Sequence, residues 1–150
     1  MIDNGLAEQT LEEVAASCLA GRELRKFAME RLSRLPGYNW SGIYRLENET
    51  LLLDEYVGAE TDHAQIAIGV GVCGTAVAED RNQVIEDVRN LTNYLACSTQ
   101  TRSEIVVLIR DLEGATLGQI DVDGHQVGAF GASDEGFLTQ LAELLAKNWD

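Results

Sequence analysis

The chain has 150 residues and a mass of 16.4 kDa, the size of one domain with a substantial core. Its net charge of −14 and pI near 4.4 argue against binding to nucleic acid or to anionic membrane surfaces. No stretch approaches the roughly 20 apolar residues of a membrane helix. The first residues, MIDNGLAEQ, lack the basic-then-apolar order of a signal peptide, so we expect a cytoplasmic protein. Three widely spaced cysteines do not indicate a disulfide framework.

The first part of the chain is predicted to be helical. Residues 8–34 carry apolar side chains at helical spacing, and Gly21 is expected to break or bend this run. The sequence leaves open whether residues 1–35 form one helix or two. Cys18 falls on the apolar stripe of the first turns, together with Leu11 and Val14, and is therefore assigned to the core.

After Pro36 the apolar period falls to two, the spacing of strands. Six segments are predicted strands: NWSGIYRL (39–46), LLLDEYV (51–57), QIAIG (65–69), QVIEDV (83–88), EIVVLIRD (104–111) and TLGQIDVD (116–123). A short helix is expected within 69–80, and a long loop over 89–103. The last segment, 132–149, has the apolar stripe of a helix, with Ser133 as its expected N-cap.

Strands joined by hairpins imply an antiparallel sheet, which indicates an α+β layer fold. The helices from the two ends of the chain would cover one face of the sheet. The short helix and the long loop would lie over the other face and form a pocket there.

The last predicted hairpin places three carboxylates on one face of the sheet. If Leu112 and Ala115 flank a two-residue turn, Glu104 lies opposite Asp123. Asp121 is two residues further along, hence on the same face. Two interpretations stay open. The carboxylates belong to a solvated strand end with Arg102 as counter-ion, or they bind a ligand ammonium while one of them keeps its proton.

Cys97 lies on the loop that leads into this acidic strand. A thiolate becomes a strong nucleophile when cationic neighbours lower the pKa of its thiol, and Arg102 is the nearest candidate. The neighbouring carboxylates would keep the thiol protonated until a substrate arrives. A small packed cysteine is the alternative interpretation.

Cys73 is expected near the N-terminus of the short helix, where the helix dipole favours a thiolate. The glycines around it in GVGVCGTA allow another backbone or a ligand to approach closely. This stretch lacks the third glycine and the acidic residue of a dinucleotide fingerprint. No short-spaced Cys or His pair occurs, so no metal site is expected.

Several motifs together resemble a known family. They are NWSGIY (39–44), GVGVCGTAVA (69–78), VIEDV (84–88), YLACS (94–98), SEIVV (103–107), LGQIDVD (117–123) and FGASDEGF (130–137). In this order they are similar to the GAF domain, and specifically resemble the free methionine-(R)-sulfoxide reductases. The resemblance implies a single GAF domain over 1–150, with a helical segment at 1–35 and the GAF core at 38–150.

The resemblance also implies a mechanism. The thiol matched by Cys97 attacks the sulfur of free methionine sulfoxide. The acids matched by Glu104, Asp121 and Asp123 bind the substrate and assist loss of its oxygen. The resulting sulfenic acid is converted to a disulfide by a second thiol, and thioredoxin or another external thiol reduces it, so no bound cofactor is expected.

Two aromatic residues and one absent cysteine complete the comparison with that family. Trp40 and Tyr44 would surround the methyl end of the substrate, although a core aromatic pair is the ordinary alternative. The family usually carries a resolving cysteine about ten residues before Cys73. Here the region 58–69 has none, and His63 stands near its place. Cys73 or an external thiol would then resolve the sulfenic acid, or turnover has been lost.

A GAF module that senses a small molecule without chemistry is the alternative function. Phe130, Asp134 and Glu135 match half of a cyclic-nucleotide motif, F-x(3)-D-E, but its Asn-Lys half is absent. The same pattern also serves as an aromatic plug followed by a helix start. Homodimerisation or partner binding through the amphipathic terminal helices stays open.

Overall fold

The computed structural model describes residues 1–95 and 99–150. Within these ranges the elements follow the predicted order closely. They are α1 (Asn4–Ala16), α2 (Gly21–Leu32), β1 (Trp40–Glu47), β2 (Thr50–Val57), β3 (Gln65–Ala67), α3 (Gly71–Glu79), β4 (Gln83–Ile85), a 3-10 turn (Val88–Asn90), β5 (Ser103–Arg110), β6 (Thr116–Gly124) and α4 (Ala132–Lys147).

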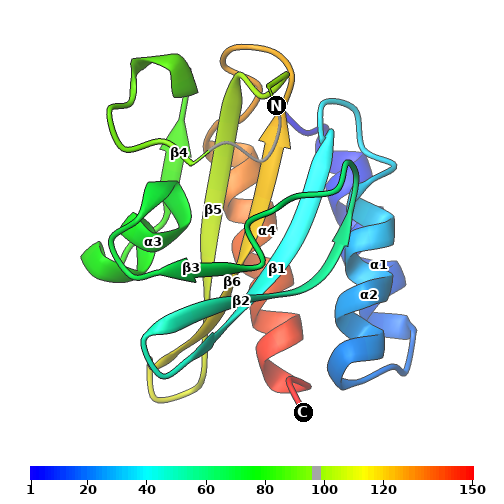
Figure 1. Cartoon of the computed structure of the whole chain (residues 1–150). Coiled ribbons are helices and arrows are strands. Elements are labelled where there is room, and N and C mark those ends of the chain that lie inside the picture. Colours follow the sequence, from blue (N-terminus) through cyan, green and yellow to red (C-terminus); the bar gives the residue numbers. More distant parts are fainter. Residues whose placement is uncertain (96–98) are drawn as a thin grey trace.

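The described strands form one antiparallel sheet in the order β3-β2-β1-β6-β5-β4. The long strands β1, β6 and β5 lie at its centre, and the short strands β3 and β4 lie at its edges (Figure 1). This confirms the predicted α+β class with an antiparallel sheet.

Helices α1, α2 and α4 cover one face of the sheet, as expected for the helices from the two ends of the chain. Figure 1 shows α4 passing behind the central strands, with α1 and α2 beside it. Alternate strand residues such as Ile43, Ile105 and Ile120 pack against these helices and are fully buried. Within the described ranges, every helix is too short or too polar to traverse a lipid bilayer.

The N-terminal helical run is divided in two, and the assignment of Cys18 to the core is wrong. Helix α1 ends at Ala16 and α2 begins at Gly21. Cys18 lies between them with φ of 60°, outside helical geometry, and its side chain is exposed. The apolar stripe therefore stops before Cys18. Gly21, with φ of 60°, acts as the expected breaker.

The N-cap of α4 is Gly131, not Ser133. The carboxylate of Asp134 reaches back to accept a hydrogen bond from the Gly131 amide at 2.9 Å. It also accepts hydrogen bonds from the Tyr38 hydroxyl at 2.7 Å and the Ile2 amide at 3.0 Å. Asp134 therefore fixes the start of α4 against the N-terminal segment. That is the structural use of the F-x(3)-D-E pattern.

The β5–β6 register agrees with the prediction at the acidic residues. Glu104 pairs with Asp123, and the same register holds as far as Ile109. At Arg110 a bulge shifts the pairing, so residues 111–115 connect the strands instead of a two-residue turn. The predicted turn is wrong in this detail, but the bulge lies at the far end from the acids and leaves their facing unchanged.

Candidate active site

The face of the sheet opposite the three large helices combines apolar, aromatic and acidic side chains. Three rows cross β1, β6 and β5 in register: Trp40–Asp123–Glu104, Gly42–Asp121–Val106 and Tyr44–Gln119–Leu108. Successive rows are roughly 7 Å apart along the strands. Helix α3 packs over this face through Val72, Cys73 and Ala76. The expected two-faced arrangement is confirmed.

The three acids are buried, which excludes the solvated strand end. Glu104 is 3% exposed, Asp123 is 1% exposed and Asp121 is fully buried. Arg102 is not their counter-ion, because its guanidinium donates hydrogen bonds to the main-chain oxygens of Thr99 and Thr101. Three carboxylates have therefore been removed from water, and such a cluster requires protons or a cation to offset its charge.

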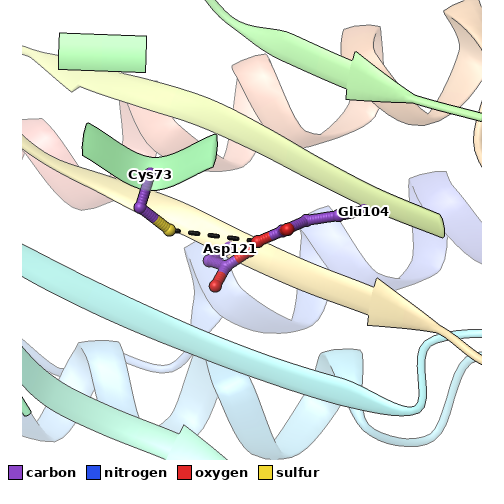
Figure 2. Close-up of side chains that lie close together, drawn as sticks. All are labelled: Cys73, Glu104 and Asp121. Atoms are coloured by element: carbon purple, nitrogen blue, oxygen red, sulfur yellow. Dashed lines mark hydrogen bonds between the residues drawn. The ribbon is translucent and has the colours of Figure 1, made fainter. Parts of the chain in front are cut away.

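Cys73 lies within this acidic cluster. It occupies the first turn of α3, and its Sγ is 3.9 Å from Oε2 of Glu104. Ligand atoms of Cys73, Glu104 and Asp121 all lie within 4.8 Å of one another. Figure 2 shows the three side chains converging from α3, β5 and β6. The sequence predicted the acids and the helix start separately, and the tertiary structure brings them together.

Two glycines around Cys73 bring α3 close to the neighbouring backbone. A Cβ at Gly74 would overlap the main-chain oxygen of Ala67 on β3, and one at Gly71 would overlap the side chain of Leu95. Asn93 adds hydrogen bonds, since its Oδ1 accepts from the Gly71 amide at 3.2 Å. The loop before residue 96 is thus attached to the helix that carries Cys73.

Asp121 is an acid whose protonation is perturbed by its burial. Neither of its oxygens has a hydrogen-bond partner of acceptable geometry among the described residues. Burial raises the pKa of Asp121 above the ordinary carboxyl value, and the nearby Glu104 and Cys73 oppose this shift only in part. A carboxyl in this position tends to retain a proton, which suits it to act as a proton donor.

Trp40 and Tyr44 both lie on the acidic face, as predicted. The Trp40 indole stacks on Tyr56 and donates a hydrogen bond to the Ala59 oxygen at 2.9 Å. A Cβ at Gly42 would overlap this indole, so glycine allows the ring to lie across the row that contains Asp121. The Tyr44 hydroxyl donates to the main-chain oxygen of His63 at 2.9 Å. Both rings are therefore fixed in place.

Gln119 is a polar residue of this face that sequence reasoning missed. It is fully buried between Tyr44 and Leu108, and neither its amide nitrogen nor its amide oxygen has a partner among the described residues. The signal was present, because Gln119 precedes Asp121 by two residues and therefore shares its face. A buried carboxamide without partners is available to a bound polar molecule.

Cys97, the predicted nucleophile, lies outside the described residues. Its described flanks both approach the acidic cluster. Leu95 lies against Gly71, two residues from Cys73. On the other side, the Arg102 amide donates to the Gly124 oxygen at 2.8 Å, immediately before Ser103 and Glu104. Two hollows elsewhere on the molecule, of about 830 Å³ beside α4 and about 320 Å³ outside α3, do not contain the acids.

A family model and individual known proteins match this chain and point to the same family. A family model described as a GAF domain matches residues 22–150. The free methionine-R-sulfoxide reductase of Escherichia coli is 40% identical over 114 residues, covering 76% of this chain and 68% of that protein. The Saccharomyces cerevisiae enzyme of the same name is 39% identical over 113 residues. That alignment covers 73% of this chain and 62% of the yeast protein, so the chain matches somewhat less than two thirds of it.

Solved structures agree with these sequence matches. A free methionine-R-sulfoxide reductase from Neisseria meningitidis, determined in complex with its substrate, superposes with a TM-score of 0.90. It is 26% identical, and the match covers 99% of this chain and 92% of that one. The fold is thus shared over nearly the whole length of both chains.

Proposed function

The chain belongs to the GAF domain family, in the branch that includes the free methionine-R-sulfoxide reductases, and we propose that it is a thiol-dependent reductase of free methionine-R-sulfoxide. The observation that carries the proposal is the buried cluster of Glu104, Asp121, Asp123 and Cys73. A buried acidic cluster of this kind suits a small cationic group such as the ammonium of a free amino acid. The fixed indole beside it suits an apolar methyl end.

The chemistry begins at Cys97. Its thiolate attacks the sulfoxide sulfur, the oxygen transfers to the cysteine, and methionine leaves with a Cys97 sulfenic acid remaining. Glu104 and Asp123 hold the substrate ammonium. Asp121, whose pKa burial raises, supplies a proton to the sulfoxide oxygen as its bond to sulfur breaks.

A second thiol completes the cycle. It attacks the sulfenic sulfur of Cys97, water leaves, and a disulfide forms. Cys73 is the proposed resolving thiol, supported by its place in the acidic cluster and by the contact of Gly71 with Leu95. Thioredoxin or a similar dithiol then reduces the disulfide, so the electrons come from thiols and no bound cofactor takes part. This chemistry needs a reducing compartment, which is why we place the protein in the cytoplasm.

The test is consumption of the two epimers of free methionine sulfoxide, measured separately with thioredoxin and with dithiothreitol. Wild type should reduce the R epimer alone, and Cys97→Ser should be inactive. Cys73→Ser should lose turnover with thioredoxin and keep it with dithiothreitol. The exposed Cys18 provides a matched control, since Cys18→Ser should change neither rate.

Equal consumption of both epimers, or full activity of Cys97→Ser, would contradict the proposal. Tight binding of free methionine sulfoxide without turnover would identify a sensing module instead. Homodimerisation through the amphipathic terminal helices stays open, and light scattering would test it.

A further inference from the structure

Three side chains of the acidic cluster also have the composition of a metal-binding site. The Cys73 sulfur and one oxygen each from Glu104 and Asp121 lie within 4.8 Å of one another. All three residues are buried and project from different elements toward one point (Figure 2). Short sequence spacing, the usual sign of such a site, is absent because the sheet and α3 bring the ligands together.

An independent observation indicates a cationic ligand. Asp121 is fully buried, it points into this cluster, and neither of its oxygens has a hydrogen-bond partner of acceptable geometry in the described part of the chain. Among the described residues, no basic side chain forms an ion pair with it. Native structures rarely leave a buried carboxylate in this condition, so the group is available to a bound cation.

The sulfur atom decides which cation fits. Mg²⁺ and Ca²⁺ prefer six or more oxygen ligands, whereas Zn²⁺ and Cd²⁺ bind thiolate and carboxylate in small tetrahedral sites. With bonds of about 2.0–2.3 Å, ligand atoms around zinc are roughly 3.3–3.8 Å apart. The distance of 3.9 Å between Cys73 Sγ and Glu104 Oε2 is already close to this spacing. We propose that Cys73, Glu104 and Asp121 form a binding site for a thiophilic divalent cation of the Zn²⁺ class.

Binding of the ion rests on this geometry alone, while its consequence rests on the proposed function. The acids that would hold the ion are those proposed to hold the substrate and to donate its proton. The thiolate is the one proposed to resolve the sulfenic acid. Zn²⁺ and free methionine sulfoxide therefore exclude each other, and zinc acts as a competitive inhibitor that also blocks disulfide formation.

The experiment titrates Zn²⁺ alone into the full-length reduced chain by calorimetry, in a Cys18→Ser background that removes the exposed thiol. Co²⁺ serves as a spectroscopic probe, because a cobalt–thiolate bond gives a near-ultraviolet charge-transfer band. We expect one tight zinc site and a cobalt–thiolate band. Competition is measured in Cys97→Ser, which the substrate cannot oxidise, and both signals should be lost there when free methionine-R-sulfoxide is present in excess. Zn²⁺ should also raise the Tm, as any ligand of the folded state does.

Three variants on this background identify the ligands. Cys73→Ser should abolish the cobalt–thiolate band and lower zinc affinity by more than the roughly 10- to 100-fold that loss of an outer partner costs. Asp121→Asn is nearly isosteric and should fold normally, so it should weaken zinc binding and keep the cobalt–thiolate band. Cys97→Ser should keep the wild-type zinc affinity and the cobalt–thiolate band. Thermal unfolding checks that each variant is folded.

Unchanged zinc affinity in Cys73→Ser and Asp121→Asn would overturn the inference, and so would a cobalt band that disappears in Cys97→Ser. Reductase activity, measured with a phosphine that binds zinc poorly, separates the two proposals. A chain that reduces the R epimer but binds no zinc disproves the metal site and leaves the function. A chain that binds zinc at this site but reduces neither epimer disproves the function and leaves the site.

Discussion

Two fully buried aspartates on opposite faces of the sheet have contrasting surroundings. Asp134, at the start of α4, accepts three hydrogen bonds, from the Ile2 amide, the Tyr38 hydroxyl and the Gly131 amide. Asp121, on β6, accepts none of acceptable geometry from the described residues. Both aspartates are equally removed from water, but the described part of the protein supplies hydrogen bonds to Asp134 and none of acceptable geometry to Asp121.

The difference separates structure from function. A buried carboxylate whose hydrogen bonds are all supplied by the protein stabilises the fold and offers nothing to a ligand. One that lacks partners destabilises the fold until a proton or a cation arrives, which is typical of a binding or catalytic group. Mutation of the two residues should therefore have opposite consequences.

The largest effect is expected from Asp121→Asn on catalysis. A positioned general acid typically contributes about 10²–10⁴-fold to the rate, so kcat/KM for the R epimer should fall roughly 100- to 10000-fold when Asn replaces the proton donor. The variant should remain folded, with a Tm at neutral pH no lower than that of wild type. Steady-state kinetics and thermal unfolding on the same preparations measure both quantities. Wild-type kcat/KM in this variant would show that Asp121 takes no part in catalysis.

The next effect is expected from Asp134→Ala on stability. It removes three hydrogen bonds to a buried carboxylate, and we expect the free energy of unfolding to fall by about 2–4 kcal/mol. At this chain length the Tm should fall by roughly 2–4 °C for each kcal/mol. Activity per folded molecule, measured well below the Tm, should stay within about twofold of wild type, because none of the hydrogen bonds of Asp134 to the described residues involves the acidic cluster. A variant that loses activity but keeps the wild-type Tm would show that Asp134 has a functional role instead of a structural one.

The smallest effect is a pH dependence that follows from Asp121. Its folded-state pKa is raised above the unfolded value, which is about 3.9. The protonated form is therefore favoured by folding, and its stabilisation is complete below about pH 3.9 and is lost as pH rises through the folded pKa. The Asp121→Asn variant has an amide at this position, which cannot titrate. The variant's unfolding free energy, minus that of wild type, should thus increase with pH over this window.

Denaturant titrations of both proteins at several pH values measure this difference, in which the shared carboxylates largely cancel. A difference that is constant with pH would mean that Asp121 has an unperturbed pKa in the folded chain.

Sequence reasoning succeeded where alternation along a strand decides the outcome. Glu104, Asp121 and Asp123 were placed on one face because the period of a strand is two, and the observed pairing of Glu104 with Asp123 confirms this. Gln119 was missed although the same rule applies to it. The prediction for Cys18 is wrong because the helical spacing of apolar residues continues in the sequence beyond Ala16, where α1 ends.

Long-range partners could not be read from local pattern. Ser133 has the preferred chemistry of an N-cap, yet the N-cap of α4 is Gly131. The nearby Asp134 accepts hydrogen bonds from Tyr38 and Ile2, which are distant in the sequence. Arg102 is near the acids in sequence, yet it donates to main-chain oxygens of its own loop. In both cases the contacts depend on the three-dimensional arrangement of the chain, which the identities of neighbouring residues do not specify.

Local periodicity and short hairpin connections are enough to predict the antiparallel sheet, its two contrasting faces and the alignment of three acids. The burial of the acids, the approach of Cys73 from α3, and the lack of hydrogen-bond partners for Asp121 among the described residues emerge only from the folded chain. These properties depend on which distant segments pack together, and local periodicity carries no information about that. Strand alternation fixes only the direction in which a side chain points.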